Sequence, residues 1–468
     1  MYQDMFERKR KRPLAMTECN EERFEFDSFS GARQIVAEFS GGAITSDGGG
    51  LLLQETDAKL NLLSRFSQCF LDSRNPLLIE HSVEQMIRQR VYGLALGYED
   101  LNDHEQLRQD PLLCAIAGKA QPGAEALAGK STLNRLELGS GVPTRYKKIT
   151  FWRDGVDQLL VDVLLEAHTA PPQQIVLDID TTDLALHGNQ EGKFYHGYYK
   201  HYCYLPLYIF CGAHVLCARL RPSSVGPAVG SRKEVERIVK QIRQRWPEVE
   251  IILRGDSGFC SDELLTWCEE NNVNYVVGVA RNQRLEGLID GPLAEARQQF
   301  EATQQAARIF VEFEHQTLQG TWSRKRRVVA KAEHIDGKSN PRFIVTSLDS
   351  DHWEKQKLYE ELYCARGDME NRIKEQFVLF ADRVSASTMR ANQLRIYLSV
   401  IAYTLLNGLR RLGLQTTTMA TAQVGTIRLK LLKIGALIKV TVRKVWVRMA
   451  SSYPYQARFS QVLQQLRT

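Results

Sequence analysis

Hydrophobic and polar positions repeat with two different periods along the chain, and the period changes near Pro171-Pro172. Before this point apolar residues recur at intervals of three and four, most clearly over residues 83–94 and 156–165. Such spacing is typical of amphipathic helices. We therefore predict a mainly helical N-terminal region over residues 1–170.

After Pro172, strand-like runs and amphipathic helices alternate. The predicted strands are 174–180, runs within 194–211 and 213–221, 249–253 and 273–279, and the predicted helices are 231–246 and 261–271. This order indicates a mixed α/β sheet, the fold class that we assign to the central part of the chain.

The remaining segments complete the predicted domain organisation. Alternation returns over 305–349, which favours a β-rich insertion at 286–352, and residues 353–412 have helical spacing. The core is then split into a first part, 171–285, and last helices, 353–415. Residues 416–468 form a basic C-terminal region, in which apolar positions between 434 and 447 indicate a packed element.

Charge is distributed unevenly along the chain. The 86 residues from Arg383 to Thr468 contain 14 Lys or Arg and no Asp or Glu, whereas the other 382 residues contain 47 basic and 55 acidic side chains. A basic run, Arg8-Lys9-Arg10-Lys11-Arg12, lies near the start. An asymmetry of this kind points to a polyanionic partner such as DNA, although a short basic run alone is more often a solvated arm.

Composition excludes several other classes of protein. Nine cysteines without any C-x-x-C pair argue against a disulfide framework and a zinc ribbon. No run of 18 uncharged apolar residues is present, and the first residues lack the apolar segment of a secretory signal. We expect a soluble cytoplasmic protein without membrane contact.

Three acidic positions lie where a carboxylate is costly. Asp178 and Asp180 interrupt an apolar strand and share one of its faces, opposite the neighbouring apolar residues. Asp256 follows the strand 249–253, and Glu370 lies in a helical stretch where Tyr363 and Arg366 share its face. Carboxylates brought together in this way repel one another unless a divalent cation lies between them.

Hard oxygen ligands suit Mg²⁺ or Mn²⁺. Two such ions about 3.5–4 Å apart can activate the attacking oxygen and stabilise the leaving oxygen of an in-line phosphoryl displacement. The candidate chemistry is therefore cleavage and transfer of DNA strands.

Each acid also has a structural interpretation. Asp256, before Ser257-Gly258, is a typical turn or N-cap residue, and Glu370 is spaced to pair with Lys374. Asp178 and Asp180 are harder to explain in this way, because two carboxylates within one apolar strand are uncommon. The three contexts together favour a site.

The same residues resemble the DDE transposases of bacterial insertion sequences, in the group whose third motif reads Tyr-x2-Arg-x3-Glu-x6-Lys. Tyr363, Arg366 and Glu370 match this spacing, but Phe377 stands at the lysine position, which leaves Lys374 as the alternative. The first two motifs are similar to Ile179-Asp180-Thr181-Thr182 and Leu253-Arg-Gly-Asp256-Ser-Gly-Phe. Further similar blocks are 98–104, 131–135 and 391–395, so the resemblance spans about residues 30–415.

This resemblance implies an RNase H-like catalytic core interrupted by a β-rich insertion, and a two-metal site. Asp180, Asp256 and Glu370 would be the catalytic metal ligands. Tyr363, Arg366 and Lys374 would contact DNA. The implied function is cleavage at transposon ends and strand transfer into target DNA, with two copies of the chain in the DNA complex.

Alternation alone does not separate Asp178 from Asp180. We assign Asp180 as the first catalytic acid because it lies nearer the strand's end and is followed by Thr181-Thr182. Asp178 would then orient a metal-bound water or pair with a cation such as Arg254.

Three other patterns have weaker functional interpretations. Gly129-Lys130-Ser131 lacks the glycine spacing of a phosphate loop, so we expect no nucleotide cofactor. A zinc site at Cys203, Cys211, His214 and Cys217 is less favoured than core thiols. The tyrosines at 195, 198, 199, 202 and 204 could stack on bases, although filling a sheet face is their commoner use.

Two rival functions remain at this stage. One is another RNase H-like nuclease that cuts without joining strands. The other is a non-catalytic or domesticated DNA-binding protein, against which the presence of all three acids argues.

Overall fold

The computed structural model describes residues 23–26, 35–119, 125–139, 141–317 and 321–468. The basic run 8–12 lies outside the described residues. The strands are β1 Arg23–Phe26, β2 Ile35–Glu38, β3 Ile44–Thr45, β4 Phe70–Asp72, β5 Ile149–Phe151, β6 Gln174–Thr181, β7 Leu184–Ala185, β8 Phe194–His196, β9 His201–Tyr204, β10 Leu207–Cys211, β11 His214–Arg219, β12 Glu250–Gly255, β13 Asn274–Val279, β14 Ala307–His315, β15 Arg326–Ile335, β16 Lys338–Ser339, β17 Arg342–Thr346, β18 Ala436–Val440 and β19 Val445–Met449.

The helices lie on both sides of the main sheet and in a separate helical region. They are α1 Gly50–Leu60, α2 Leu62–Gln68, α3 Val83–Leu96, α4 His104–Leu107, α5 Pro111–Ile116, α6 Lys130–Glu137, α7 Arg153–Glu166, α8 Ser231–Arg245, α9 Asp262–Glu270, α10 Gln283–Gly287, α11 Asp290–Thr303, α12 Lys355–Lys357, α13 Gly367–Val378, α14 Met389–Gly413, α15 Val424–Ile427 and α16 Gln456–Arg467. Short 3₁₀ turns lie at Pro76–Leu78, Leu101–Asp103, Ser257–Phe259 and Cys364–Arg366, and π-helical segments at Leu358–Tyr363 and Arg428–Leu432.

A large mixed sheet forms the centre of the fold. Its order is β11-β10-β6-β12-β13-β17-β15-β14, with β16 paired to β15. Strands β6, β12 and β13 run parallel, and the outer pairings are antiparallel. The prediction of a mixed α/β architecture is confirmed at this level.

Strand alternation determines what each face of the sheet buries. Ile175, Leu177 and Ile179 belong to a core that includes residues of α8 and α9. Ile252 on the opposite face packs with Leu358 and other residues of the π-helical segment. Asp178 and Asp180 therefore lie on the face covered by the helix that leads to Glu370.

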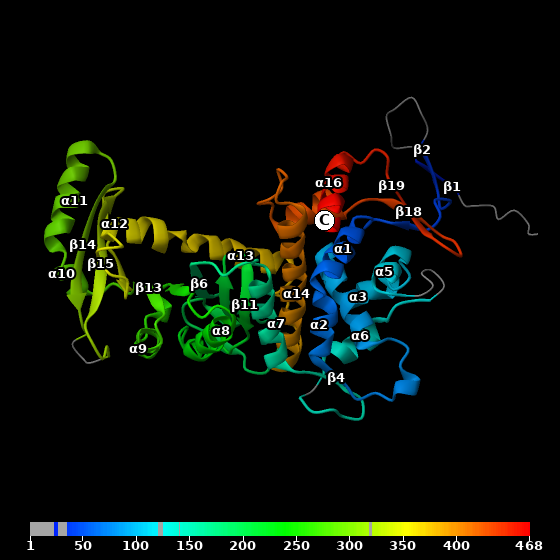
Figure 1. Ribbon diagram of the computed structural model, residues 1–468, viewed down its shortest axis with the longest axis horizontal. Coiled ribbons are helices and arrows are strands. Elements are labelled where there is room, and N and C mark those ends of the chain that lie inside the picture. Colours follow the sequence, from blue (N-terminus) through cyan, green and yellow to red (C-terminus); the bar gives the residue numbers. More distant parts are fainter. Residues whose placement is uncertain (1–22, 27–34, 120–124, 140, 318–320) are drawn as a thin grey trace, which may run out of the picture.

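The region predicted as a β-rich insertion extends the same sheet. Strand β17 pairs with β13, and β15 and β14 follow outward. Residues 290–303 are helical (α11), so the segment predicted as a β-rich insertion also carries a helix before its strands. Figure 1 shows α10, α11, β14 and β15 at one end of the molecule, and the N-terminal helices at the other.

The helix α14 lies at the centre of the helical region. It is buried on nearly all sides, which explains its mostly apolar sequence. It shares one core with α1 and α3 and with the sheet residues Tyr208 and Phe210. The segment 353–412, predicted as helical, is divided at 379–388, where the chain turns between α13 and α14.

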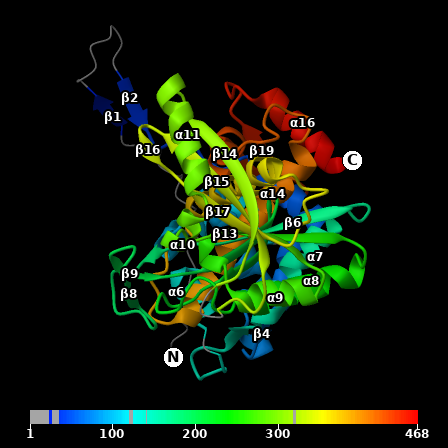
Figure 2. The same cartoon turned by 90° about the vertical axis from the view of Figure 1, so that its left-hand side faces the viewer.

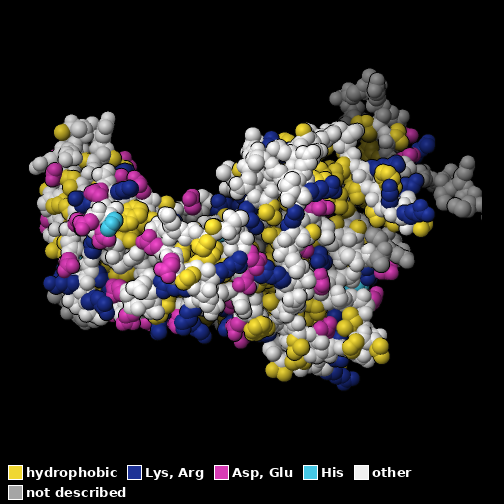
Figure 3. Space-filling model, in the orientation of Figure 1, with side chains coloured by type: hydrophobic (Ala, Val, Ile, Leu, Met, Phe, Trp, Pro, Cys, Tyr) yellow, Lys and Arg dark blue, Asp and Glu magenta, His cyan; other side chains and the backbone are white. Residues whose placement is uncertain are grey.

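The basic C-terminal region is folded onto the helical region. Strand β18 pairs with both β19 and β3, and α16 contacts α14 and α1. Ile434 and Ile438 are buried, as expected for a packed element. Figure 3 shows Lys and Arg side chains over the β18–β19 hairpin.

Candidate active site

Two of the predicted acids lie at neighbouring strand ends. In the parallel pair β6–β12, Arg254 is opposite Asp178 and Gly255 is opposite Ile179. The next position on each strand is Asp180 and Asp256, so these two carboxylates come from adjacent points of one sheet edge. Asp256 also accepts a hydrogen bond from the Gly258 amide at 2.9 Å, so the capping role weighed from the sequence is present as well.

The third acid comes from a helix with an irregular backbone. The π-helical segment Leu358–Tyr363 is followed by a 3₁₀ turn, Cys364–Arg366, and then by α13, which begins at Gly367 and carries Glu370. Changes of helical pitch leave carbonyl groups without their usual partner, and π-helical segments occur frequently at functional sites.

An ion pair fixes this helix to the sheet. Arg254 donates to both carboxylate oxygens of Asp178, from Nε at 2.5 Å and from Nη2 at 2.8 Å. Its Nη1 donates to the carbonyl oxygen of Leu362, at the end of the π-helical segment. Burial raises the pKa of Asp178, and the hydrogen bonds from Arg254 oppose this shift. The carboxylate of Asp178 is thus committed to Arg254, whereas that of Asp180 is not.

Arg366 links the first acid to the third. Its guanidinium lies 3.2 Å from Oδ2 of Asp180 and 3.6 Å from Oε1 of Glu370. The pKa of Asp180 is raised to about 6, mainly by burial; the carboxylates of Asp256 and Glu370 contribute to this rise, and Arg366 opposes it. The three predicted acids are therefore close enough to interact, and a single cationic side chain only partly compensates their charge.

Tyr363 lies against the strand next to the site. A Cβ atom added to Gly278 of β13 would lie 2.7 Å from the Tyr363 hydroxyl and 2.8 Å from the Ser257 amide nitrogen. Glycine is thus required at this position for the close approach of the tyrosine and the turn after Asp256. Sequence reasoning missed Gly278, although a glycine inside an apolar strand is a signal for such an approach.

Lys374 lies apart from these contacts. It is exposed on α13, one turn beyond Glu370, and the ion pair of Glu370 among the described residues is with Arg366 rather than Lys374. Phe377 stands at the position of the lysine in the Tyr-x2-Arg-x3-Glu-x6-Lys motif, and it packs against the helical core. The DNA contact expected of Lys374 stays a prediction.

The donor chemistry of this edge fits a divalent cation. Asp180, Asp256 and Glu370 offer only carboxylate oxygens, the ligands that Mg²⁺ and Mn²⁺ prefer. In the described part of the chain no three acidic, His or Cys side chains form a preformed metal centre, and the Arg366 guanidinium contacts two of the three carboxylates.

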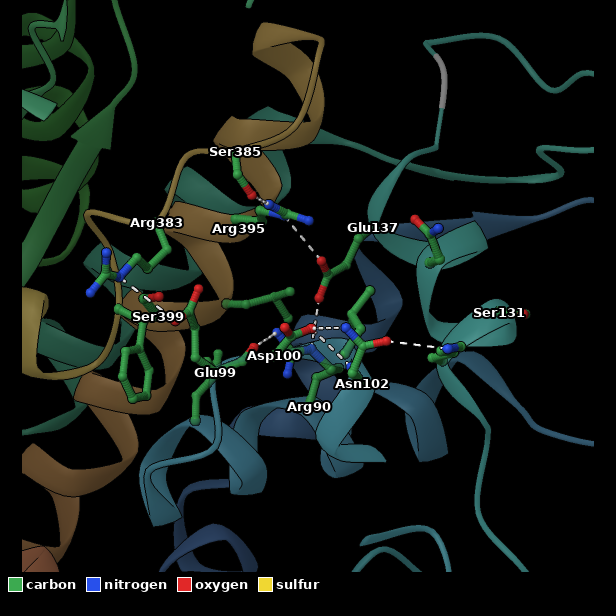
Figure 4. A pocket seen from close by; sticks show the side chains of 16 residues that line it. Arg90, Glu99, Asp100, Asn102, Ser131, Glu137, Arg383, Ser385, Arg395 and Ser399 are labelled. Atoms are coloured by element: carbon green, nitrogen blue, oxygen red, sulfur yellow. Dashed lines mark hydrogen bonds and ion pairs between the residues drawn. The ribbon is translucent and has the colours of Figure 1, made fainter. Parts of the chain in front are cut away.

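A second polar cleft, of about 430 Å³, lies in the helical region. It collects the three sequence blocks 98–104, 131–135 and 391–395, and none of the three acids lines it. Figure 4 shows that Glu137 lies between Arg90 and Arg395, at 2.7 and 3.1 Å. These ion pairs connect α3, α6 and α14, which gives the blocks a role in joining distant parts of the chain.

The glycine-lysine segment at 129–131 and the cysteines of the weaker sequence patterns have ordinary structural environments. The amide of Lys130, at the start of α6, donates to the Glu105 carboxylate at 2.8 Å. This carboxylate occupies the position at the helix N-terminus that a phosphate would take in a phosphate loop. Cys203 and Cys217 are buried. Within the described residues, none of the helices has the length and apolar character needed to cross a membrane.

Comparisons with known proteins bear on the whole chain. No curated protein matches it. The cryo-EM structure of a piggyBac transposase synaptic complex with hairpin DNA is similar to it at 11% sequence identity, with a TM-score of 0.42, over 82% of this chain and 80% of that one. A similarity of this size carries no argument about function.

The family comparison is more extensive. Residues 27–468 match the family described as Transposase DDE domain group 1, a match that includes all three acids and the helical regions on both sides of the sheet. The chain belongs to the transposase DDE domain group 1 family.

Proposed function

We propose that this protein is a DDE transposase that cleaves DNA at transposon ends and joins them to target DNA. The observation that carries the proposal is the meeting of Asp180, Asp256 and Glu370 at one sheet edge, where Arg366 lies between Asp180 and Glu370. Burial is the main cause of the raised pKa of Asp180, and repulsion from Asp256 and Glu370 adds to it. Like charges gathered around the buried carboxylate of Asp180 are costly to a fold, which favours a functional reason for them.

Asp180, Asp256 and Glu370 would hold Mg²⁺ or Mn²⁺ through their carboxylate oxygens. When bound, two such ions supply activation of the attacking oxygen and stabilisation of the leaving oxygen of the phosphodiester. This assignment agrees with the transposase DDE domain family to which the chain belongs.

The protein's own side chains would orient the DNA. Arg366 already lies between two carboxylates, and its planar guanidinium suits a bidentate contact with a phosphate. The hydroxyl of Tyr363 is held beside Gly278 and Asp256, where it can donate to a phosphate oxygen. The Asp178–Arg254 pair positions the helix that carries Arg366 and Glu370, because Arg254 holds the Leu362 carbonyl.

The finer organisation forms part of the same proposal. The order of strands β11-β10-β6-β12-β13 with acids after β6 and β12 is compatible with an RNase H-like core. Residues 1–170 would bind DNA together with 416–468, which pack in the same helical region, and two copies would act on the paired ends inside the cytoplasm.

The test is incubation of the purified protein with the DNA that flanks its own gene, in Mg²⁺. We expect strand cleavage at the element's ends and joining of the released 3′ ends to a second DNA. An Asp180→Asn variant should bind the same DNA without cutting it. Cleavage without joining would indicate another nuclease, and binding without cleavage by the unaltered protein would indicate a non-catalytic DNA-binding protein.

A further inference from the structure

The segment Lys193–Tyr202, which we name the aromatic arm, combines aromatic and basic residues beside the candidate active site. Its sequence, Lys-Phe-Tyr-His-Gly-Tyr-Tyr-Lys-His-Tyr, contains no acid, and no Asp or Glu occurs anywhere from residue 192 to residue 233. Strands β8 and β9 form the arm and pair with each other, and β7 pairs with β9. Figure 2 shows β8 and β9 projecting at the side of the body.

The tyrosines of this region have two different environments. Tyr204, at the end of β9, is fully buried and fills the core. Tyr195, Tyr198 and Tyr202 are 49%, 83% and 47% exposed. Tyr204 therefore packs in the core, as expected for a tyrosine that fills a sheet face. The other three tyrosines do not pack in the core.

The exposed rings form a connected surface with lysine beside it. Tyr195 and Tyr202 are opposite each other in the β8–β9 register, and their ring centroids are 5.5 Å apart. The Lys193 ammonium lies 4.8 Å from the centroid of Tyr202. Tyr198 contacts Tyr199 at the turn, with centroids 5.0 Å apart. Flat π faces and cations without a neighbouring acid are the features with which proteins hold single-stranded nucleic acid.

The base of the arm adjoins the first catalytic acid. Nε2 of His201 lies 2.8 Å from Oδ2 of Asp183, three residues after Asp180. The pKa of Tyr199 is raised to about 12, mainly by burial and in part by the carboxylates of Asp183 and Asp180, which places Tyr199 within electrostatic reach of Asp180. A DNA strand bound at the carboxylates of the candidate active site would therefore also contact the aromatic arm.

The root of the arm is fixed rather than loosely attached. The Glu191 amide donates to the Ser387 carbonyl, and the Glu191 carboxylate accepts from the Met389 amide at the start of α14. Ser223 donates to the Phe194 carbonyl at 3.0 Å. The rings are thus presented from a rigid support, which lowers the entropy lost when a ligand binds.

We propose that the aromatic arm binds unpaired DNA bases next to the scissile phosphate, with Tyr195, Tyr198 and Tyr202 stacking on bases and Lys193 and Lys200 contacting the backbone. This inference rests on the proposed function and adds a binding surface to it. The bases must be unpaired, because the π faces of bases within a duplex are covered by their neighbours. The arm would favour DNA whose strands separate at the cleavage position.

The test compares two probes without divalent metal, so that binding is measured apart from cleavage. One probe is a fully paired duplex, and the other is the same duplex with a short central run of mismatched base pairs. We expect the unaltered protein to prefer the mismatched probe in fluorescence anisotropy. Tyr198→Ala should weaken that binding by roughly tenfold for the loss of one stacked base, and Tyr198→Phe should retain it.

Leu288→Ala is the control, because Leu288 is 52% exposed and lies outside the arm and outside the regions 1–170 and 416–468. Its affinity for both probes should be unchanged. The double change Tyr195→Ala/Tyr202→Ala should lower the preference for mismatched DNA further, while affinity for the paired duplex stays within about twofold of the unaltered protein. Since Tyr198 is 83% exposed, its replacement should leave thermal unfolding unchanged.

Three results would overturn the inference and differ from a failure of the proposed function. The Tyr198→Ala protein could keep the full preference, it could lose affinity for both probes equally, or it could change its sedimentation without any change in DNA binding. The last result would show that a second copy of the chain covers the arm. If the unaltered protein bound neither probe, the proposed DNA function itself would be wrong.

Discussion

The sheet edge at β6 and β12 and the hairpin β18–β19 concentrate charge of opposite sign, and in both places the charge lacks full compensation. At the edge, the guanidinium of Arg366 contacts two of the three carboxylates, those of Asp180 and Glu370. On the hairpin, Lys439, Arg443, Lys444 and Arg448 are exposed, and within the described residues none has an acidic partner within ion-pair distance.

Neighbouring charges behave differently. Asp178, two residues from Asp180, forms an ion pair with Arg254. Arg410 of α14, which lies in the acid-free segment 383–468, forms an ion pair with the buried Glu375 at 2.6 Å. Paired charges of this kind join elements of the fold. The uncompensated charges are the ones available to a metal ion or to DNA, and variants can test this distinction.

The largest effect should follow removal of the metal or of one carboxylate. Cleavage should be lost in EDTA and restored by Mg²⁺ or Mn²⁺, whereas Ca²⁺ should support DNA binding with little cleavage, because its looser coordination does not suit in-line transfer. Glu370→Gln should remove most turnover and keep the fold, since Glu370 is half exposed. Gel assays of cleavage and binding decide the matter, and full cleavage in EDTA would refute the metal mechanism.

The next prediction compares Asp178, which is paired with Arg254, with Asp180, in both cleavage activity and stability. Asp178→Asn should lower cleavage by about 10–100-fold. It should also lower the free energy of unfolding by about 3–5 kcal/mol, because it leaves Arg254 buried without its counter-charge. Asp180→Asn should abolish cleavage without lowering stability, since it relieves repulsion with Asp256 and Glu370.

Denaturant unfolding and cleavage assays on both variants measure this contrast. If Asp180→Asn retained activity while Asp178→Asn had none, the assignment of the first acid would be reversed. The site of three carboxylates would survive such a result.

A smaller effect is expected at Gly278. Gly278→Ala would place a methyl group against the Tyr363 hydroxyl and the Ser257 amide, at a cost of about 1–3 kcal/mol. We expect cleavage to fall more than DNA affinity, because both Tyr363 and the turn after Asp256 must shift. Gly287→Ala, where an added Cβ has no neighbour within 4 Å, is the control and should leave both quantities unchanged.

The smallest effect concerns the hairpin and appears in the salt dependence of DNA binding. Replacing Lys439, Arg443, Lys444 and Arg448 by Gln should reduce the slope of log affinity against log salt by about 3–4 in magnitude, close to one for each phosphate contact. Stability should change little at these exposed positions. An unchanged slope would place the DNA elsewhere.

Arg410→Gln, in α14, should have the opposite effects on salt dependence and stability. It should leave the slope unchanged and lower the free energy of unfolding by about 1.5–3 kcal/mol, because the buried Glu375 would lose one of its two guanidinium partners and keep Arg372 at 2.7 Å. Deletion of residues 416–468 is a poor substitute for these variants, since buried residues such as Leu431 and Ile438 belong to the core.

The sequence by itself determined the local features of this protein. The two-residue period of 174–180 places Asp178 and Asp180 on one face, and the structure has them opposite the buried Ile175, Leu177 and Ile179. The helices 231–246 and 261–271 and the strands 249–253 and 273–279 were also predicted within a few residues. Such features follow from backbone geometry, which repeats along neighbouring residues.

Only the tertiary structure decided which charges are paired and which rings are buried. Asp178 meets Arg254, 76 residues away, through strand register, and Lys433 meets Asp47 across most of the chain. The tyrosines at 202 and 204 have the same local pattern, yet one is exposed and the other is buried. Pairing and burial depend on contacts between residues distant in sequence, and no local period encodes these contacts.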